Sequence, residues 1–329
     1  MKKVLGIASV LLLGFHLSAL GTDITYDNSS GDGLWATPAN WLTDILPTAI
    51  DKAKITRAGT IATLNSAQTI DKLQVGHLTQ TTLNIGSSGN LTVGTIDVGG
   101  FTAGQTGNIN VNGGTLASGG NFRLGNGAGS VGAMTLTSGT ITHTVGALAV
   151  GYKGTGTLNI SGGILNALGG TGFQLGTIAG SSGTVNITGG SVLAQTIDIN
   201  MLGDVTTDAQ LNLLGGSLEI LGASLGALDV GGDDKLHIEG GTFVWAGNRV
   251  ANLDTLMLSD AFSWDNGQSM LGTYQQSWTN GTSVLYADYN NINSGKTTVW
   301  ASPVPEPATI GLFSVFGLGL IGIRRLRLF

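Results

Sequence analysis

The chain has 329 residues and a formal net charge of −6 at pH 7; 55 residues are Gly, 10% are charged and none is Cys. This much Gly without a strict three-residue period excludes collagen, and the frequent Leu, Ile and Val argue against a disordered Gly/Ser polymer. The lack of Cys excludes a disulfide framework and structural Cys-zinc sites. Short apolar runs separated by Gly instead favour an all-β chain with many tight turns.

Residues 1–21 have the pattern of a secretory signal peptide. Lys2 and Lys3 form a basic start, residues 4–15 are mainly apolar, and small residues precede an expected cleavage after Gly21. A buried N-terminal helix is the alternative interpretation of this segment. The pattern predicts an exported protein.

Residues 55–250 contain two short motifs that recur in step. The first is an apolar-polar-apolar strand followed by a Gly-containing turn, and its copies begin at Ile55, Leu83, Ile109, Met134, Leu158, Val185, Leu211 and Leu236. The second is an apolar-x-apolar step that usually ends in Gly, with copies at Leu73, Ile96, Phe122, Leu148, Phe173, Ile197 and Leu228. From Leu83 onward the copies of the first motif are 24 to 27 residues apart.

This period of about 25 residues predicts a single-stranded, right-handed parallel β-helix with one repeat in each of eight coils. Leu, Ile, Val and Phe would point inward, while the intervening Asn, Thr, Gln and Asp would face solvent. Gly would form the corners, where positive φ angles are needed. No helix is expected in the body. The outward Asn and Thr would form a flat face able to bind polysaccharide through many weak contacts.

Residues 22–54 precede the first repeat, and we predict that they cap one open end of the solenoid. They contain Gly-Asp-Gly-x-Trp35, Asn40-Trp41, Pro47 and Asp51-x-Ala-x-Ile55. Together with the Asn-Ile-x-Gly-Gly repeats, this opening resembles autotransporter-like β-helix surface proteins, which implies the same fold. The chain departs from true autotransporters because a different tail stands where their translocator barrel would follow.

Residues 251–302 break the period and are richer in Trp and Tyr, including Trp264, Trp278 and Trp300. We predict a C-terminal β cap here. A flexible stalk is the alternative for part of this segment.

The tail, residues 303–329, has three parts in a fixed order. Its parts are the triplet Pro305, Glu306 and Pro307, an apolar stretch over 308–323, and a basic end with Arg324, Arg325 and Arg327. The stretch predicts a C-terminal hydrophobic helix in the membrane, with the arginines on the cytoplasmic side. The order resembles the PEP-CTERM sorting signal, which implies that an exosortase, a membrane enzyme, processes the protein near the triplet. An ordinary membrane anchor is the alternative.

The segment between the two ends is acidic. The chain has 14 Lys and Arg, and setting aside Lys2, Lys3 and the three C-terminal arginines leaves nine, against 20 Asp and Glu. Nucleic acid is not an expected partner, because binding its phosphates needs clustered basic residues.

The carboxylates show no assembled catalytic or metal site. Asp97, Asp198 and Asp229 take the same motif position in separated coils, with Asp97 and Asp198 four coils apart. The Asp233-Asp234 corner offers few of the six or more oxygen ligands that calcium needs.

The histidines His77, His143 and His237 are isolated in sequence and lack the spacing of metal ligands, and His237 takes an outward position. We therefore predict no catalytic residue, no metal and no cofactor.

These features predict a non-enzymatic, exported protein of the cell surface or extracellular matrix. The tail implies sorting by an exosortase-type system, association with exopolysaccharide, and transient or retained anchoring in the inner membrane. A polysaccharide-active β-helix enzyme, a lyase or hydrolase, is the main alternative. An adhesin that recognises a protein or a host glycan is the other.

Overall fold

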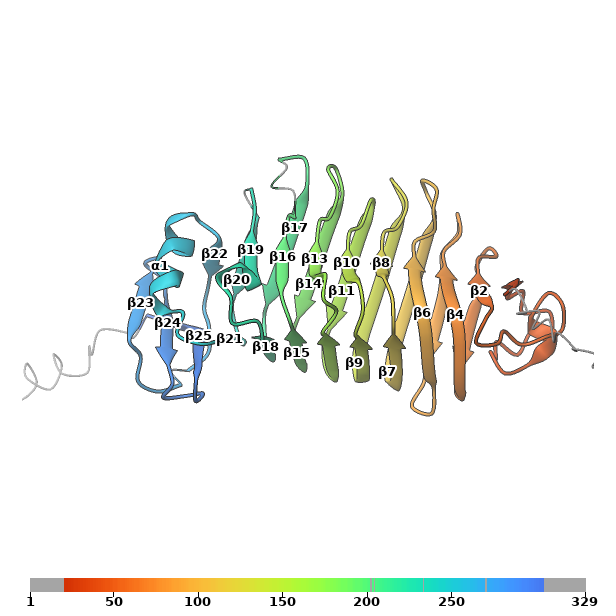
Figure 1. The fold of residues 1–329 in the computed structure, drawn as a ribbon, viewed down its shortest axis with the longest axis horizontal. Helices are drawn as coiled ribbons and strands as arrows, with labels where there is room; N and C mark the ends of the chain where they lie inside the picture. Colours follow the sequence, from red (N-terminus) through yellow and green to blue (C-terminus); the bar gives the residue numbers. More distant parts are fainter. Residues whose placement is uncertain (1–20, 202, 204, 233, 270, 305–329) are drawn as a thin grey trace, which may run out of the picture.

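The protein forms a rod in which a β-solenoid of about 10 turns winds along the long axis (Figure 1). This computed structural model describes residues 21–304 except 202, 204, 233 and 270. It confirms the parallel β-helix and its period of about 25 residues per turn. The right-handed sense of winding stays a prediction. The signal peptide up to residue 20 and the C-terminal hydrophobic helix lie outside the described residues.

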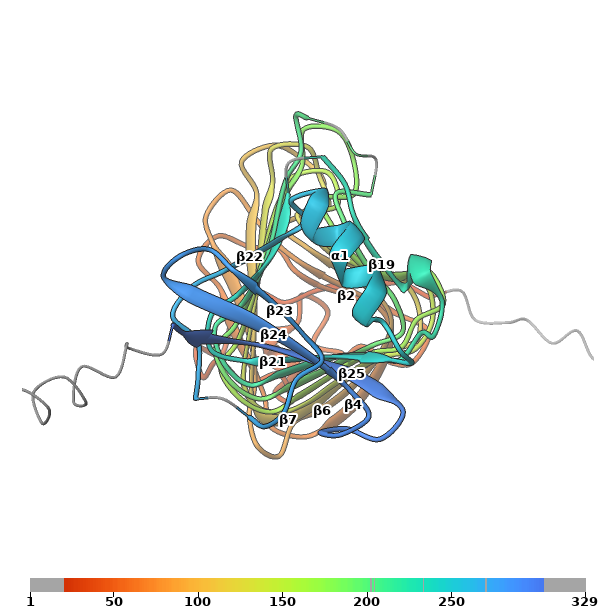
Figure 2. The ribbon, with the colours of Figure 1, turned by 90° about the vertical axis from the view of Figure 1, so that its left-hand side faces the viewer.

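The strands stack in three faces, which give the rod its roughly triangular outline when it is viewed end-on (Figure 2). Four long strands turn a corner and belong to two faces each. Face 1 is formed by β1 (Asp23–Thr25), β2 (Lys52–Ile55), the second halves of β4 (Ala67–Val75) and β6 (Asn90–Val98), β8 (Phe122–Leu124), β10 (Ala147–Val150), β13 (Gly172–Leu175), β16 (Ile197–Ile199) and β19 (Leu228–Val230).

Face 2 follows face 1 along the chain and carries the first sequence motif. It is formed by β3 (Ile61–Leu64), β5 (Thr81–Ile85), the first halves of β7 (Thr106–Ser118) and β9 (Val131–His143), β11 (Thr155–Ile160), β14 (Ser182–Ile187), β17 (Asp208–Leu213), β20 (Lys235–Ile238) and β22 (Phe262–Trp264).

Face 3 completes each coil. It is formed by the first halves of β4 and β6, the second halves of β7 and β9, β12 (Ile164–Ala167), β15 (Ser191–Ala194), β18 (Ser217–Ile220) and β21 (Thr242–Ala246).

The alternation of apolar and polar residues places the core inside the coils. In β11, Leu158 and Ile160 are buried and Asn159 between them points outward. Because the strands are in register, each inward side chain lies on its equivalent in the next coil, and Leu158 stacks between Met134 and Val185. The stacked rows form one continuous apolar core along the rod.

The Gly that ends most copies of the second motif makes the corner between faces 1 and 2. Gly125 and Gly151 have φ angles of 69° and 75°, a region that L-residues with a Cβ rarely adopt. A Cβ on Gly151 would also lie 2.2 Å from the carbonyl oxygen of Ser182 in the next coil. Asn200 occupies this corner in one coil with a φ of 60°, in keeping with the tolerance of Asn for this region.

The prediction that Ile55 begins a copy of the first motif is wrong, because Ile55 does not lie on the face that carries the other copies. Register pairs Ile55 with Val75 on face 1, whereas the face 2 strand of this coil is β3, in which Leu64 pairs with Ile85. The alternation of polar and apolar residues at 52–55 is compatible with a strand on either face, so only the strand pairing shows that it belongs to face 1. Parallel pairing extends beyond the predicted body in both directions, from Asp23 to Trp264.

Three aromatic rings fill the N-terminal end of the core, beside a short 3-10 helix (Pro38–Asn40). Trp35 and Trp41 are buried and meet edge to face with their ring centroids 4.7 Å apart, and Tyr26 meets Trp41 at 5.1 Å. The Trp41 Nε1 donates a hydrogen bond of 2.8 Å to the backbone oxygen of Trp35. These rings continue the core of the solenoid into the 22–54 segment.

The C-terminal end contains helix α1 (Val250–Leu258) and three antiparallel strands, β23 (Gln276–Thr279), β24 (Ser283–Tyr289) and β25 (Lys296–Pro303). Figure 2 shows α1, β23 and β24 lying across this end of the rod, and β25 pairs with β21. Helix α1 buries Leu253 and lies at the start of the segment predicted as a β cap, and within the body a second 3-10 helix (Leu225–Ala227) precedes β19. In the described part of the chain, no helix is long and apolar enough to cross a membrane.

Candidate functional site

The outward side chains of face 2 form a polar row along the rod, which we call the face 2 row. One residue from each of eight successive coils contributes to it. Its members are Asn84, Asn110, Thr135, Asn159, Asn186, Asn212, His237 and Ser263. Stacked strands lie about 4.8 Å apart, so this row repeats a hydrogen-bonding group at that interval.

The asparagines of the face 2 row are hydrogen-bonded to one another. Asn212 donates from Nδ2 to Oδ1 of Asn186, and Asn186 donates in the same way to Asn159, both at 2.9 Å. Asn110 donates to Asn84 at 2.9 Å, and Thr135 interrupts the series between the two groups. An amide has two donor hydrogens and two acceptor lone pairs. Asn186, in the middle of the longer group, therefore keeps one donor and one acceptor site for a ligand.

The interruption at Thr135 coincides with a shallow hollow of about 310 Å³. Its lining includes Asn84, Asn110, Asn112, Thr135 and Thr137. Thr137 and Ser138 both donate to Oδ1 of Asn112, at 3.1 and 3.2 Å. No charged residue lines this hollow.

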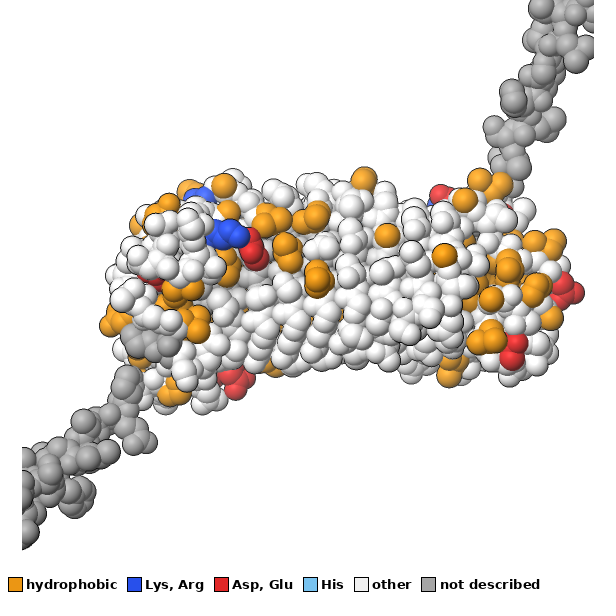
Figure 3. All heavy atoms as spheres, turned by 90° about the horizontal axis from the view of Figure 1, so that it is seen from below, with side chains coloured by type: hydrophobic (Ala, Val, Ile, Leu, Met, Phe, Trp, Pro, Cys, Tyr) orange, Lys and Arg blue, Asp and Glu red, His pale blue; other side chains and the backbone are white. Residues whose placement is uncertain are grey.

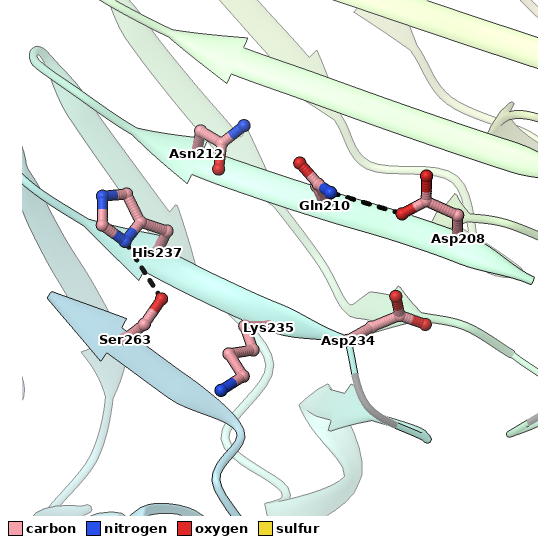
Figure 4. A pocket seen from close by; sticks show the side chains of 7 residues that line it. All are labelled: Asp208, Gln210, Asn212, Asp234, Lys235, His237 and Ser263. Carbon is pink, nitrogen blue, oxygen red and sulfur yellow. Dashed lines mark hydrogen bonds between the residues drawn. The ribbon is translucent and has the colours of Figure 1, made fainter. Parts of the chain in front are cut away.

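A second hollow, of about 440 Å³, lies at the C-terminal end of the face 2 row (Figure 4). It is lined by Asp208, Gln210, Asn212, Asp234, Lys235, His237 and Ser263. Ser263 lies 3.0 Å from Nδ1 of His237, and Gln210 donates to Asp208 at 3.3 Å. Lys235 is paired with Asp260 at 2.6 Å. Two carboxylates, an amine and an imidazole thus line one hollow from neighbouring coils, with the amine and the imidazole turned toward Asp260 and Ser263.

Asp234 is the most constrained of these groups. Its Oδ1 accepts a 2.9 Å hydrogen bond from the backbone N–H of Ala209 in the preceding coil. Its Oδ2 is buried and has no hydrogen-bond partner in the described part of the chain. An unpaired buried oxygen has a free-energy cost that a ligand donor could remove.

Sequence reasoning treated Asp234 only as part of a weak calcium corner and did not single out Asp208, Gln210 or Lys235. The period of about 25 residues could have predicted that Asp234 lies beside Ala209, because the two residues are 25 positions, or one coil, apart. Asp233 lies outside the described residues. His237 faces outward as expected.

Face 1 carries a charged outward row, which we call the face 1 row. Its members in register are Lys54, Gln74, Asp97, Arg123, Ala149, Gln174, Asp198 and Asp229. Arg123 and Asp97 form an ion pair of 3.4 Å. Burial raises the pKa of Asp97 above its usual value even though Arg123 opposes that shift. Asp97 and Asp198 are four coils apart, as predicted.

The expectation that Asp198 and Asp229 lie in separated coils was wrong, because the two residues are direct neighbours in register. Burial, reinforced by the adjacent Asp229 charge, raises the pKa of Asp198 to about 6. The two residues are 31 positions apart in sequence mainly because the corner between β18 and β19, which contains the 3-10 helix Leu225–Ala227, is longer than the equivalent corner one coil earlier. The chain accommodates the extra residues outside the stacked strands, so register is kept.

The remaining histidines do not join these sites. His143 points into the core of face 3 and is fully buried, and burial lowers its pKa. His77 is half-buried at a corner. The described residues contain no group of three or more His, Cys, Asp or Glu able to hold a metal ion.

The residues of the predicted sorting signal, Pro305, Glu306 and Pro307 with Arg324, Arg325 and Arg327, lie outside the described residues. On the side of the rod shown in Figure 3, charged side chains are sparse and lie toward the two ends. The middle of that side is uncharged.

The chain matches no protein family, and it matches neither a curated protein nor a solved structure.

Proposed function

We propose that this protein is an exported, non-enzymatic component of the cell surface or extracellular matrix that binds polysaccharide along the face 2 row. The observation that supports this most directly is the series of outward asparagines, hydrogen-bonded in pairs across coils. Sugar hydroxyls both donate and accept hydrogen bonds, so an amide row with spare donors and acceptors suits them. Many such weak contacts along one rigid face add up to useful avidity.

The face 2 row is rigid, so it can bind a ligand without first rearranging. Each asparagine is fixed by its neighbours and by a strand paired on both sides, so little side-chain entropy is lost when a chain of sugars docks. The face is also uncharged around Asn159 and Asn186, which favours neutral polysaccharide there.

The binding proposal can be tested with three stacked substitutions, Asn159→Ala, Asn186→Ala and Asn212→Ala. Affinity electrophoresis with neutral glucans and with the host's own exopolysaccharide should show loss of retardation. The matched control is Asn90→Ala, Thr115→Ala and Thr140→Ala, three outward positions stacked in the same way on face 3. Equal binding by both triple variants and the unaltered protein would contradict the proposal.

Export and sorting are proposed from the sequence of the two ends. The signal-peptide pattern and the order of Pro305-Glu306-Pro307, apolar stretch and arginines support recognition by an exosortase-type enzyme. Anchoring by the C-terminal helix would hold the protein at the inner membrane until or unless it is processed. Fusing residues 303–329 to a secreted reporter in an exosortase-bearing host, with the triplet changed to Ala, tests this. Unchanged processing and localisation would contradict it.

A polysaccharide lyase or hydrolase is the second candidate function, favoured by the 440 Å³ hollow. Carboxylates and a basic group brought together in a cleft can perform general acid-base chemistry on a glycosidic link. The protein would be incubated with acidic and neutral glycans and assayed for new reducing or unsaturated ends. Chain shortening that disappears in the double variant Asp208→Asn and Asp234→Asn would favour the enzyme and contradict the purely binding role.

A further inference from the structure

A third hollow, of about 430 Å³, lies away from the face 2 row, at the corner between faces 1 and 2. Three successive coils contribute to it, each through the turn that follows its face 1 strand. The hollow, which we call the Tyr152 hollow, is lined by Phe101, Arg123, Asn126, Gly127, Ala128, Tyr152 and Lys153.

The charge of the Tyr152 hollow is opposite to that of the protein as a whole. Arg123 and Lys153 both lie against the Tyr152 ring, with their charged groups 4.8 and 5.4 Å from its centroid. Aromatic faces attract cations, so the ring holds the two positive groups close together.

Arg123 is partly neutralised by its 3.4 Å ion pair with Asp97. Lys153 is exposed, and no carboxylate of the described residues lies within 4.0 Å of it. Of the other lysines in the described part of the chain, each has an acidic partner within that distance. Lys153 is therefore free to pair with an anionic ligand.

Asn126 is an independent sign of a ligand. The residue is only 5% exposed, yet its side-chain amide lines the hollow and forms no hydrogen bond with any other described residue. Its amide atoms are not among the fully buried side-chain atoms that lack a partner, so they face the open hollow, where the amide has room for a hydrogen-bond partner. A ligand oxygen or hydroxyl in the hollow would supply it.

The apolar side of the hollow is supplied by Phe101, which is 53% exposed. An exposed ring beside polar and cationic groups is suited to the C–H face of a sugar. Gly127 lets the backbones of the two corners pack closely here, because a Cβ at that position would lie 2.4 Å from the Phe101 carbonyl carbon.

We infer that the Tyr152 hollow binds a uronic acid unit of an acidic polysaccharide. Lys153 pairs with the carboxylate, Asn126 hydrogen-bonds a hydroxyl or carboxylate oxygen, and Phe101 packs against the sugar ring. This inference rests on the proposed polysaccharide-binding function but concerns a different face and a different sugar class.

The test compares Lys153→Gln and Asn126→Ala with Lys72→Gln in the full chain. Lys72 is exposed on face 1 and loses the same charge outside the hollow. Titration calorimetry with polygalacturonate, dextran sulfate and neutral dextran is expected to show about tenfold weaker polygalacturonate binding for each hollow variant, the size of one lost charge-assisted hydrogen bond. Lys72→Gln should bind like the unaltered protein.

Unchanged polygalacturonate binding in Lys153→Gln, or an equal loss in Lys72→Gln, would overturn the inference. So would Lys153-dependent binding of dextran sulfate as tight as that of polygalacturonate, because the hollow would then recognise charge alone. Neutral glycan binding that depends on the face 2 asparagines, without any polygalacturonate binding, would overturn this inference and leave the proposed function standing. If no glycan bound at all, the proposed function would fall as well.

Discussion

The face 1 and face 2 rows are built by the same stacking but differ in what it places together. On face 2 it places amide beside amide, and Asn159, Asn186 and Asn212 become a hydrogen-bonded series. On face 1 it places opposite charges together at Asp97 and Arg123 and like charges together at Asp198 and Asp229. The face 2 row contains only favourable contacts between amides, while the face 1 row contains one favourable and one unfavourable pair.

The difference shows that in a solenoid the hydrogen bonding and the pKa of an outward residue depend on its neighbours one coil away. An asparagine such as Asn186 donates one hydrogen bond and accepts another because the equivalent residues in both adjacent coils are also asparagines. An exposed Asp on a strand face is solvated, whereas burial, and after it the charge of Asp229 one coil away, raises the pKa of Asp198 to about 6. Four substitutions test this comparison, from the largest expected effect to the smallest.

The core beneath both rows should dominate stability. Leu158 is 1% exposed directly inside the face 2 row, so Leu158→Ala is expected to lower the free energy of unfolding by about 3 kcal/mol. Thr157→Ala, one residue earlier and outward, should cost less than about 0.5 kcal/mol. Urea denaturation measures both, and similar costs for the two variants would contradict the inward and outward assignment.

Reversing the favourable pair on face 1 comes next. Arg123→Asp places a second carboxylate beside Asp97, whose side chain is only 14% exposed, and is expected to cost about 2 kcal/mol. Arg123→Lys, which keeps the charge, is the control and should cost clearly less. Urea midpoints measured at low and high salt would show the repulsion weakening with salt. A salt-independent loss would mean that packing, and not charge, is responsible.

Removing the unfavourable pair should stabilise the protein in a pH-dependent way. Because the pKa of Asp198 is raised to about 6, the folded state holds its proton more tightly than the unfolded chain does. Ionised Asp198 therefore costs stability above about pH 6, and the cost disappears as pH falls toward the unfolded value near 3.8. Asp198→Asn should gain about 1.5 kcal/mol at pH 8, since its amide can donate to Asp229, and nothing near pH 4.

Thermal or urea unfolding of both proteins across this pH range provides the measurement. Asp71→Asn is a suitable control, because Asp71 is an exposed carboxylate beside Lys72. A gain for Asp198→Asn that does not change with pH would contradict the explanation.

The smallest effect is expected in the amide series. Asn186→Ala removes two hydrogen bonds of 2.9 Å at a partly exposed position and should cost about 1 kcal/mol. Asn166→Ala on face 3, whose contact with Thr142 is 3.5 Å long, should cost less. If the two variants were equally stable, the face 2 series would contribute polar groups to the surface but nothing to stability.

Much of the fold follows from the repeated pattern in the sequence. The motif copies at Leu158 and Val185 predict stacked strands, and the Asn after each predicts the face 2 row. The Gly after Leu124 predicts the corner, because positive φ restricts that position to few residues. Helix α1 could not be predicted in this way, since its nine residues have only weak helical amphipathicity and depend on the burial of Leu253.

The sequence by itself determined the period, the inward and outward sides of each strand and the acidic composition of the body. Only the tertiary structure decided which outward residues meet. Register brings Asp198 to Asp229 across a long corner, moves Ile55 from face 2 to face 1, and brings Asn126 and Lys153 to one hollow. The physical reason is that backbone pairing between coils fixes neighbours at a constant spacing, while corners of different length take up whatever sequence lies between.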